Sequence, residues 1–404
     1  MIHWWRDEAT ITRFVCDLVA AEMSVLRPTG VVAPSAGWDA TLHLSHDLGL
    51  DSLERVALAS ALNEAIHLHE AGIEDRLLIR HTIGEWVAIA QDGLEVFSAT
   101  MTFRTSGSSG APKRCEHALS HLWQEVETLA PLFAGRRRVL SAVRGHHIYG
   151  FLFTVLLPSK LALRGRDLVD LRHRAPTSVV AELRAGDLVV GYPDFWRAVA
   201  QTGTIIPSGV TGITSTAPCP PEVAHDLAAR GLDTLVELYG SSETAGIGLR
   251  SSAADPYSLM SFWQRADGDA NTLVRVAPNG TTTIYQLQDR LEWVDERRFR
   301  PAGRLDEALQ VAGVNVFPAK VRRVLMEHPD VRDAAVRRMS DDPLSRLKAF
   351  VVPREGRTGD ASLHAELEAW VTSRLSTPER PKAFTFGDAI PVQAGKGTDW
   401  PSIT

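Results

Sequence analysis

The segment TFRTSGSSGAPKRCEH, residues 102–117, gathers glycines and hydroxyl side chains just before a lysine. Successive backbone N–H groups of such a turn can converge on phosphate oxygens, while the hydroxyls add donors and the lysine adds positive charge. The spacing differs from that of a P-loop, because Gly110 is followed by Ala111 and Pro112 before Lys113. Taken alone, the segment predicts either a loop that binds phosphate or a flexible surface turn.

Three later segments carry charged residues that could act on a nucleotide. ELYGSSETAGIG contains Glu243, a carboxylate of the kind that binds Mg²⁺ together with phosphate oxygens. LQDRLEWVDERRFRPAGRLDE contains Asp289, Arg304 and Asp306, and FGDAIPVQAGKGTDW contains Lys396. Individually, Arg304 and Asp306 could form a structural ion pair, and Lys396 could be an exposed lysine of the tail. Only the order of the segments along the chain favours a shared nucleotide site.

In this order, the four segments resemble the motifs of the adenylate-forming superfamily, which includes acyl-CoA synthetases, the adenylation domains of nonribosomal peptide synthetases and luciferases. TSGSSGAPK is similar to the phosphate loop of that family, and Tyr239, Gly240, Ser242 and Glu243 match its Tyr-Gly-x-Thr-Glu signature. The resemblance covers about residues 100–404. It implies an ATP- and Mg²⁺-dependent acid–thiol ligase that forms an acyl-AMP and then transfers the acyl group to a phosphopantetheine thiol.

The resemblance implies a role for each matched residue, in a reaction where negative charge builds up between a carboxylate and a triphosphate. Lys396 would be the catalytic lysine that stabilises the carboxylate and the forming bond. Lys113 would hold the β- and γ-phosphates, Glu243 would ligate Mg²⁺, and Asp289 would accept from the ribose hydroxyls. The stretch 215–218 is similar to the segment that contacts adenine, or else is a proline-rich turn. The implied nucleotide-binding residues are Thr105, Ser106, Gly107, Ser108, Ser109, Gly110, Ser215, Ala217, Tyr239, Gly240, Ser242, Asp289 and Arg304.

The segment VRGHHIYGFLF bears on the acid substrate. Many members of the family carry a His-aromatic segment beside the acyl pocket, so the resemblance implies that His147, Tyr149 and Gly150 line it. A lone buried histidine is otherwise more often a core residue. We expect a small aromatic acid such as a hydroxybenzoate. The layout is also similar to the ligases of bacterial aryl-polyene pigment clusters, which belong to secondary metabolism.

The sequence departs from the family pattern at several positions. Ser109 and Ser242 replace the usual threonines and keep the hydroxyl, whereas Arg114 replaces the glycine that usually follows the lysine. Leu309 and Gln310 stand where the hinge segment usually has a lysine, a change that bears on the thioester-forming step. The segment that usually precedes the phosphate loop is largely absent, so we expect a trimmed large domain.

Helical periodicity dominates the chain before the phosphate loop. Residues 10–26 have apolar side chains at helical spacing, a second helix is expected from Asp51 or Ser52 to Ile66, and two shorter helical segments follow. Together they predict a four-helix bundle. LSHDLGLDSLERVAL is similar to the Asp-Ser-Leu site of acyl carrier proteins, which makes Ser52 the implied attachment point for phosphopantetheine. The ordinary alternative is that Ser52 is a helix N-cap.

From about residue 95, strand-like runs such as DLVVGY and LVELYG alternate with helical ones, which predicts a mainly parallel α/β sheet. We therefore expect a carrier-like helical bundle over residues 1–93, an adenylate-forming large domain over 94–305 and a small α+β domain over 306–404. Asp306 is the expected hinge about which the small domain swings between two half-reactions.

The composition is that of an ordinary soluble protein of 404 residues, with 44% hydrophobic and 23% charged residues. The net charge of -6 offers no general attraction to nucleic acid or to an anionic membrane. No apolar run reaches the ~20 residues of a membrane span, and the cysteines show no disulfide or metal spacing, so we expect a cytoplasmic protein. Arg136, Arg137 and Arg138 are expected to form a solvated loop.

Three functions stay open at this point. In the first, the ligase passes the acyl group to an acyl carrier protein, either in cis through Ser52 or in trans, with a phosphopantetheinyl transferase as a further partner. In the second, the chain is a CoA ligase with a vestigial bundle. In the third, it is a non-catalytic carrier and interaction protein with a decayed ATP site, which the presence of Lys396, Glu243 and Asp289 argues against.

Overall fold

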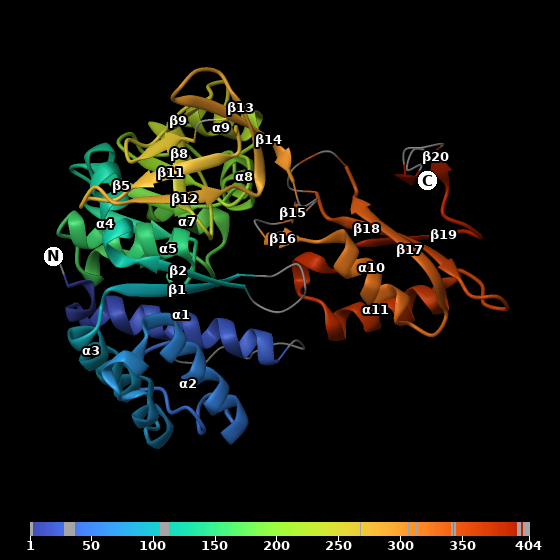
Figure 1. Cartoon of the computed structure of the whole chain (residues 1–404), viewed down its shortest axis with the longest axis horizontal. Coiled ribbons are helices and arrows are strands. Elements are labelled where there is room, and N and C mark those ends of the chain that lie inside the picture. Colours follow the sequence, from blue (N-terminus) through green and yellow to red (C-terminus); the bar gives the residue numbers. More distant parts are fainter. Residues whose placement is uncertain are drawn as a thin grey trace. The chain divides into compact units, whose positions relative to one another are not determined.

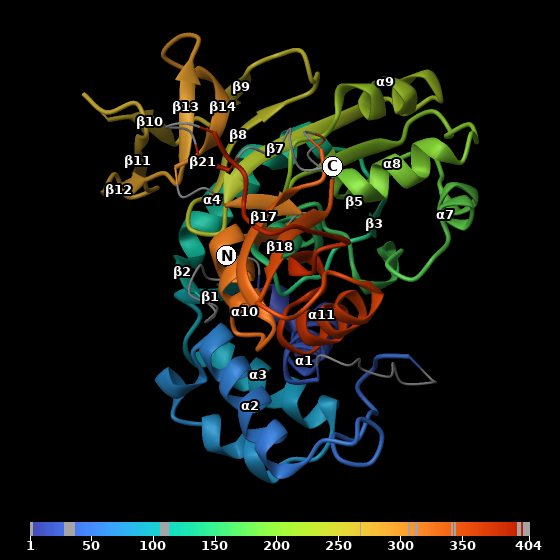
Figure 2. The same ribbon diagram turned by 90° about the vertical axis from the view of Figure 1, so that its right-hand side faces the viewer.

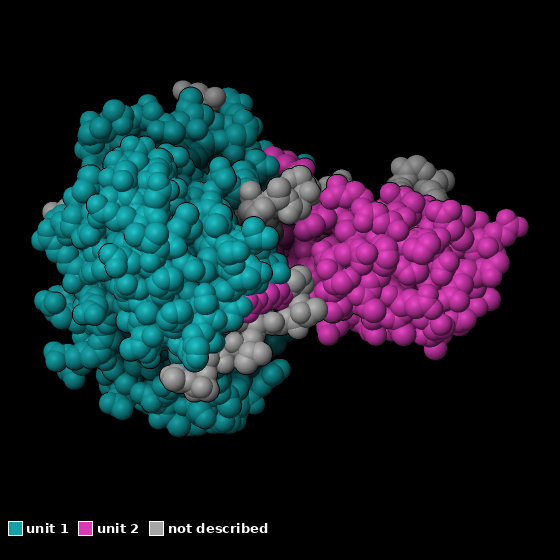
Figure 3. All heavy atoms as spheres, turned by 90° about the horizontal axis from the view of Figure 1, so that it is seen from below, with its two compact units in different colours: residues 1–26, 31–105, 113–303 teal, residues 27–30, 106–112, 304–404 magenta. Residues whose placement is uncertain are grey.

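The computed structural model describes residues 3–27, 37–105, 113–266, 268–305, 308–311, 314–340, 342, 345–393 and 397–398. They form two compact units, of which the first holds most of the chain up to Gly303 and the second consists mainly of residues 304–404 (Figure 3). The expected combination of a large α/β unit and a small C-terminal unit is confirmed. None of the helices in these ranges is long and apolar enough to cross a membrane.

The helices before the sheet begin at well-defined caps. At the start of α2 (Ser52–Ile66), Asp51 accepts from the Glu54 amide at 2.8 Å and Glu54 accepts from the Asp51 amide at 3.1 Å. Thr82 and Glu85 form the same reciprocal contact before α3 (Ile83–Val96). Ser52 is therefore the first helical residue, and the N-cap is Asp51. The remaining elements of this segment are η1 (Trp4–Arg6), α1 (Glu8–Leu26), η2 (Leu68–Ala71) and η3 (Glu74–Ile79).

These helices lie against the rest of the first unit (Figures 1 and 2). They share one hydrophobic core with its sheet. Trp4 and Phe14 both meet the ring of Phe151 edge to face, with centroids 5.2 and 5.7 Å apart, and all three rings are buried. The four expected helical segments are present, the third as the 3-10 helix η3. The carrier-like bundle over residues 1–93 is not confirmed, because its apolar faces pack on the sheet unit and do not close a separate core.

A nine-stranded sheet organises the first unit, with strands in the order β13 (Asp289–Trp293), β14 (Arg298–Arg304), β9 (Tyr257–Leu259), β8 (Ala245–Arg250), β7 (Thr234–Ser241), β6 (Thr211–Thr214), β5 (Asp187–Gly191), β3 (Arg138–Ser141) and β4 (Leu168–Asp170). From β4 to β7 neighbouring strands are parallel, whereas β8 pairs antiparallel with both β7 and β9. The carboxyl ends of the parallel strands meet at one edge, where α/β proteins bind ligands.

Helices precede or connect the parallel strands and bury their own apolar faces, as expected for a sheet in which every residue of β5 is buried. They are α4 (Leu119–Leu129), η4 (Ala130–Phe133), α5 (Ile148–Phe151), the π-helix η5 (Leu152–Leu156), α6 (Leu157–Lys160), η6 (Gly165–Asp167), α7 (Pro176–Glu182), α8 (Pro193–Gln201) and α9 (Pro221–Ala229). Two small antiparallel sheets complete the unit, formed by β1 (Thr100–Thr105) with β2 (Lys113–Ala118), and by β10 (Trp263–Arg265), β11 (Thr272–Val276) and β12 (Thr282–Gln286).

The second unit has its own core around a three-stranded sheet, β17 (Val331–Arg338), β18 (Leu347–Pro353) and β19 (Ala383–Phe386), with α10 (Pro318–Met326) and α11 (Ala361–Arg374) packed on it. A buried ion pair of 2.6 Å between Lys320 and Glu379 ties α10 to η7 (Thr377–Glu379). The other strands are β15 (Leu309–Val311), β16 (Val314–Val316), β20 (Val392–Gln393) and β21 (Gly397–Thr398).

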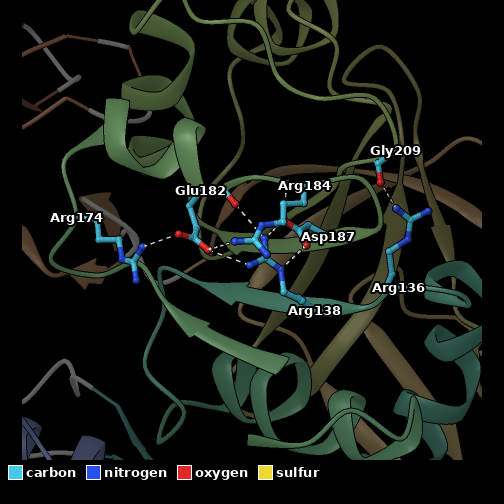
Figure 4. Close-up of polar contacts among 7 residues, drawn as sticks. All are labelled: Arg136, Arg138, Arg174, Glu182, Arg184, Asp187 and Gly209. Atoms are coloured by element: carbon cyan, nitrogen blue, oxygen red, sulfur yellow. Dashed lines mark hydrogen bonds and ion pairs between the residues drawn. The ribbon is translucent and has the colours of Figure 1, made fainter. Parts of the chain in front are cut away.

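The expectation that three successive arginines form a solvated loop holds for Arg137, which is exposed, but not for Arg138, the first residue of β3. The side chain of Arg138 is only 16% exposed, and it donates to Asp187 at 2.7 and 2.9 Å and to Glu182 at 2.9 Å (Figure 4). Arg136 donates to the carbonyl oxygen of Gly209 at 2.7 Å. These contacts join the amino ends of β3 and β5, at the edge of the sheet opposite to the carboxyl ends.

Candidate functional site

The turn between β7 and β8 presents Glu243. The Ser241 hydroxyl accepts from the amides of Glu243 and Thr244 at 3.2 and 3.3 Å. The Thr244 hydroxyl in turn accepts from the Ser241 amide at 3.1 Å. Gly240 has no room for a side chain, since a Cβ there would lie 2.1 Å from the carbonyl oxygen of Ala245. The signature segment thus folds into a narrow turn that carries one carboxylate.

Lys113 meets this carboxylate from a distant part of the sequence. Its Nζ lies 2.6 Å from Oε1 of Glu243, and the two side chains are 51% and 34% exposed. Burial raises the pKa of Glu243, but the hydrogen bond and the charge of Lys113 outweigh burial and hold the pKa below its ordinary value. A partly accessible cation beside a carboxylate can take a phosphate group and the metal ion that accompanies it.

Tyr239 and Asp289 form a second contact between predicted residues. The Tyr239 hydroxyl lies 2.5 Å from Oδ2 of Asp289, to which it donates. Its ring packs against Tyr257 and Phe299, with centroids 5.4 and 5.3 Å away, so that the tyrosine is held by the antiparallel part of the sheet. The implied ribose-binding aspartate therefore has a fixed orientation at the start of β13.

The stretch that follows β6 supplies polar groups next to β7. The Ser215 hydroxyl donates to the carbonyl oxygen of Leu238 at 2.9 Å, and Ala217 is buried. Thr216 has a φ of 78°, a strained conformation for a β-branched residue. The hydroxyls of Thr214 and Thr216 are buried and have no hydrogen-bond partner in the described part of the chain. Such hydroxyls fit a bound polar ligand, so this stretch is compatible with an adenine nucleotide.

Several predicted site residues lie outside the described residues. For Thr105, the backbone is described as part of β1, but the side chain is not. Arg304 is the last residue of β14, and it is assigned to the second unit, whereas the residues described above belong to the first. In the ranges that the structure describes, no three His, Cys, Asp or Glu side chains gather as a metal site. A single carboxylate such as Glu243 is compatible with Mg²⁺ that is also bound by phosphate oxygens. The predicted residues outside the described ranges are Ser106, Gly107, Ser108, Ser109, Gly110, Asp306 and Lys396.

The segment expected beside the acyl pocket follows β3, at the carboxyl edge of the sheet. His147 is exposed, and its ring lies 4.0 Å from that of His146. Tyr149 is buried, and its hydroxyl donates to the backbone oxygen of Gly191 at 2.9 Å, which ties the segment to β5. A Cβ on Gly150 would lie 1.9 Å from the carbonyl oxygen of Arg144, so only glycine fits. His147 is thus the member of this group with an accessible side chain.

Sequence reasoning missed two buried residues that contact the Glu243 turn. His117, on β2, has its Nε2 2.7 Å from the carbonyl oxygen of Ser242. Glu125, on α4, accepts from the Gly246 amide. A usable signal existed for Glu125, because it shares the apolar face of its helix with Leu122, at helical spacing. A charged residue on such a face is costly unless it has partners.

Comparison with known proteins agrees with these motifs. A family described as AMP-binding enzyme matches residues 98–270, and one described as AMP-binding enzyme C-terminal domain matches residues 320–395. A 4-coumarate–CoA ligase of Halorhodospira halophila is 40% identical over 85% of this chain and 86% of its own. Proteins of the same name from Cereibacter sphaeroides and Rhodobacter capsulatus are 37% and 36% identical, and cover 98% and 96% of this chain and 97% and 100% of their own lengths.

Solved structures share the fold at low sequence identity. An amide bond synthetase from Marinactinospora thermotolerans matches with a TM-score of 0.63 and 19% identity, over 97% of this chain and 93% of that one. A malonyl-CoA ligase matches with a TM-score of 0.59 and 21% identity, over 72% of this chain and 71% of that one. At such identities the likeness concerns the fold alone.

Proposed function

This chain belongs to the family of AMP-binding enzymes, as an AMP-forming acid–thiol ligase, and on that premise we propose that it activates an aromatic carboxylic acid with ATP and transfers the acyl group to coenzyme A. 4-Coumarate is the first acid to test, because relatives that match most of the chain carry it in their names. It is a hydroxylated aromatic acid, as is the hydroxybenzoate that the sequence led us to expect.

The observation that carries the proposal is the contact of Lys113 with Glu243 at 2.6 Å. When a carboxylate oxygen attacks the α-phosphate of ATP, pyrophosphate leaves, and the thiol then attacks the acyl carbon and releases AMP. Lys113 would bind the phosphates and offset their charge, and Glu243 would hold Mg²⁺, which when bound adds charge stabilisation on the leaving pyrophosphate. Asp289, oriented by Tyr239, would accept from the ribose hydroxyls.

Lys396 completes the proposed site as the residue that stabilises the acid carboxylate and the forming bond. Arg304 would support the nucleotide, and Asp306 would be the hinge of the C-terminal domain. His147 would be the residue of the His-aromatic segment that reaches the acid, because its side chain is the accessible one. We place the enzyme in the cytoplasm, since all three cysteines are free thiols in buried positions.

Transfer to a carrier protein is the second candidate, and the exposure of Ser52 at the start of α2 supports it. In that case a transferase would attach phosphopantetheine to Ser52, or a separate carrier would supply the thiol. Against it, α2 packs in the same core as the sheet, so its serine cannot travel as that of an independent carrier domain can. CoA as acceptor needs no such movement.

ATP–pyrophosphate exchange with a panel of aromatic acids tests the first half-reaction. We expect exchange with 4-coumarate or a close analogue, followed by thioester formation when CoA is added. A chain that exchanges pyrophosphate but acylates only a phosphopantetheine arm would favour the carrier function. Absence of exchange with every acid would contradict the ligase proposal and favour a decayed ATP site.

A further inference from the structure

We infer that His117 and Glu125 are positioning residues that hold the backbone of the Glu243 turn at two points, Ser242 and Gly246, so that the Glu243 carboxylate stays in place for Mg²⁺ and ATP. This inference rests on the proposed function for its catalytic meaning. We call the contacts of His117 with Ser242 and of Glu125 with Gly246 the clamp; both are hydrogen bonds within the first unit. Both residues belong to the segment that begins at Lys113 and continues through β2 into α4.

His117 contacts the turn at Ser242, the residue before Glu243. Its side chain is only 4% exposed, and its Nε2 is 2.7 Å from the carbonyl oxygen of Ser242. Because a carbonyl oxygen can only accept, Nε2 must carry the proton. Burial lowers the pKa of His117, so the ring is neutral at physiological pH. Lys113 lies four residues earlier on the same strand and therefore on the same face, so one strand contacts both Ser242 and Glu243.

Glu125 contacts the chain just after the turn, at Gly246 in β8. The side chain is fully buried, and its two oxygens lie 3.1 and 3.0 Å from the amide nitrogen of Gly246. A Cβ at Gly246 would lie 2.3 Å from Oε1 of Glu125, so any other residue there would displace this carboxyl group. The carboxylate therefore fixes the point at which the turn re-enters β8.

Arg275 on β11 is the charged group that faces Glu125, and it too reaches this region. It is buried, donates to the carbonyl oxygen of His121 at 2.6 Å and lies 3.5 Å from that of Thr244. A buried carboxylate and a buried guanidinium are costly to desolvate, and apolar residues of similar size often stabilise a fold at least as well. Three polar side chains thus contact the backbone of one short turn and of the strand that follows it, which restricts the geometry of the turn.

The test separates hydrogen bonding from packing. His117→Leu and Glu125→Leu remove the donor and the acceptor, whereas His117→Gln and Glu125→Gln keep an amide N–H and an amide oxygen at similar reach. Asp187→Asn is the matched control, because it disturbs a buried ion pair at the opposite edge of the sheet (Figure 4). We measure ATP–pyrophosphate exchange at varied MgATP, thermal unfolding, and amide hydrogen exchange of the peptide containing residues 241–246.

We expect both leucine variants to raise the KM for MgATP or lower kcat by about tenfold, the scale of a small misplacement of a catalytic group. The glutamine variants should stay within about threefold of wild type, and the control should lose thermal stability with unchanged KM. Faster amide exchange in the 241–246 peptide should accompany the leucine variants alone. If the leucine variants do not fold, His117→Asn is used in their place, because the asparagine amide is too short to reach Ser242. Compared with His117→Gln, it should show the same kinetic defect and the same faster amide exchange.

Equal KM, kcat and amide exchange in the leucine and glutamine variants would overturn the inference and leave a packing role only. If wild type activates no acid, the proposed function fails. The clamp is then judged by amide exchange alone: faster exchange in the leucine variants supports it, and unchanged exchange overturns it.

Discussion

At the scale of single residues, the candidate site depends on charges that the fold brings together from distant segments. Lys113 and Glu243 are 130 residues apart in sequence and form an ion pair of 2.6 Å. In the free protein they neutralise each other, which keeps both side chains in place while partly exposed to water. Under the proposed function, a triphosphate would give Lys113 a partner of opposite charge and its metal ion would do the same for Glu243, so that binding would replace one compact ion pair by two.

Lys396 allows a direct test at this scale. Lys396→Ala should slow ATP–pyrophosphate exchange by about 10²-fold, the scale for the loss of one preorganised charge at a reacting centre. The KM for ATP should change less, because the phosphates are assigned to other residues. Lys382→Ala, at an exposed lysine of the same unit, is the control and should leave exchange unchanged. Normal exchange in the Lys396 variant would remove this residue from the mechanism.

Glu125 makes stability depend on pH in an unusual direction. Burial raises its pKa to about 7, against the opposing effects of Arg275 and the Gly246 amide. In the unfolded chain a glutamate has a pKa near 4.3. Between pH 4.3 and about pH 7, Glu125 therefore binds more protons in the folded state than in the unfolded state, and the folded state loses stability as the pH rises. The stabilisation by protonated Glu125 is fully present below pH 4 and is lost by about pH 7. It amounts to at most a few kcal/mol.

Glu125→Gln removes that titration. We measure the unfolding free energies of wild type and Glu125→Gln from pH 5 to pH 8. As the pH rises, the stability of wild type should fall relative to that of Glu125→Gln. Because every other group titrates in both proteins, the difference isolates this carboxyl. Parallel stability curves would show that Glu125 keeps an ordinary pKa.

At the scale of elements, α1 is joined to the sheet by charge as well as by apolar packing. Asp17 is 4% exposed, accepts from the Gly145 amide at 2.7 Å and forms an ion pair with Arg172. Gly145 lies two residues before His147, so this contact also holds the segment that we assign to the acid pocket. A helix fastened in this way cannot leave the sheet without exposing buried charge.

Asp17→Ala should destabilise the first unit by about 3–5 kcal/mol, because it leaves Arg172 partly buried without this counter-ion. Asp92→Ala, at an exposed position on α3, should change stability by less than about 0.5 kcal/mol. Chemical denaturation followed by the tryptophan fluorescence of the intact chain gives both values. A loss below 1 kcal/mol for Asp17→Ala would mean that the ion pair contributes little.

The elements themselves were largely predictable from the sequence. Helices over residues 8–26, 52–66 and 83–96 follow their apolar periodicity and caps, and β5 and β7 follow their apolar runs. Periodicity does not identify the partner of each apolar face, so it predicts a separate bundle where the helices instead pack against the sheet. Arg138 was misjudged for the same reason, since Asp187 lies 49 residues away and nothing local reveals the pairing. The motifs singled out Lys113, Glu243, Tyr239 and Asp289 one by one, but neither the contacts that pair them nor the buried residues behind the Glu243 turn were predicted.

At the scale of the whole molecule, the question is where the acyl group goes after it is activated. A carrier domain works because it moves as a body and brings its arm to the site. Here α2, which begins at Ser52, buries Leu58 and Leu62 in the core that the sheet shares. An arm on Ser52 would start from a fixed helix, whereas CoA diffuses to the site by itself.

Ser52→Ala should therefore leave CoA thioester formation within about twofold of wild type, as for a surface substitution remote from the chemistry. Ser120→Ala, at an exposed serine on α4, is the control for loss of a surface hydroxyl. Intact mass after incubation with a phosphopantetheinyl transferase, ATP and the acid should show no added arm on either variant or on wild type. The contrary result is that wild type gains a phosphopantetheine arm and then an acyl group, while Ser52→Ala gains neither. The chain would then carry its own acceptor, and α2 would have to move more than the burial of Leu58 and Leu62 suggests.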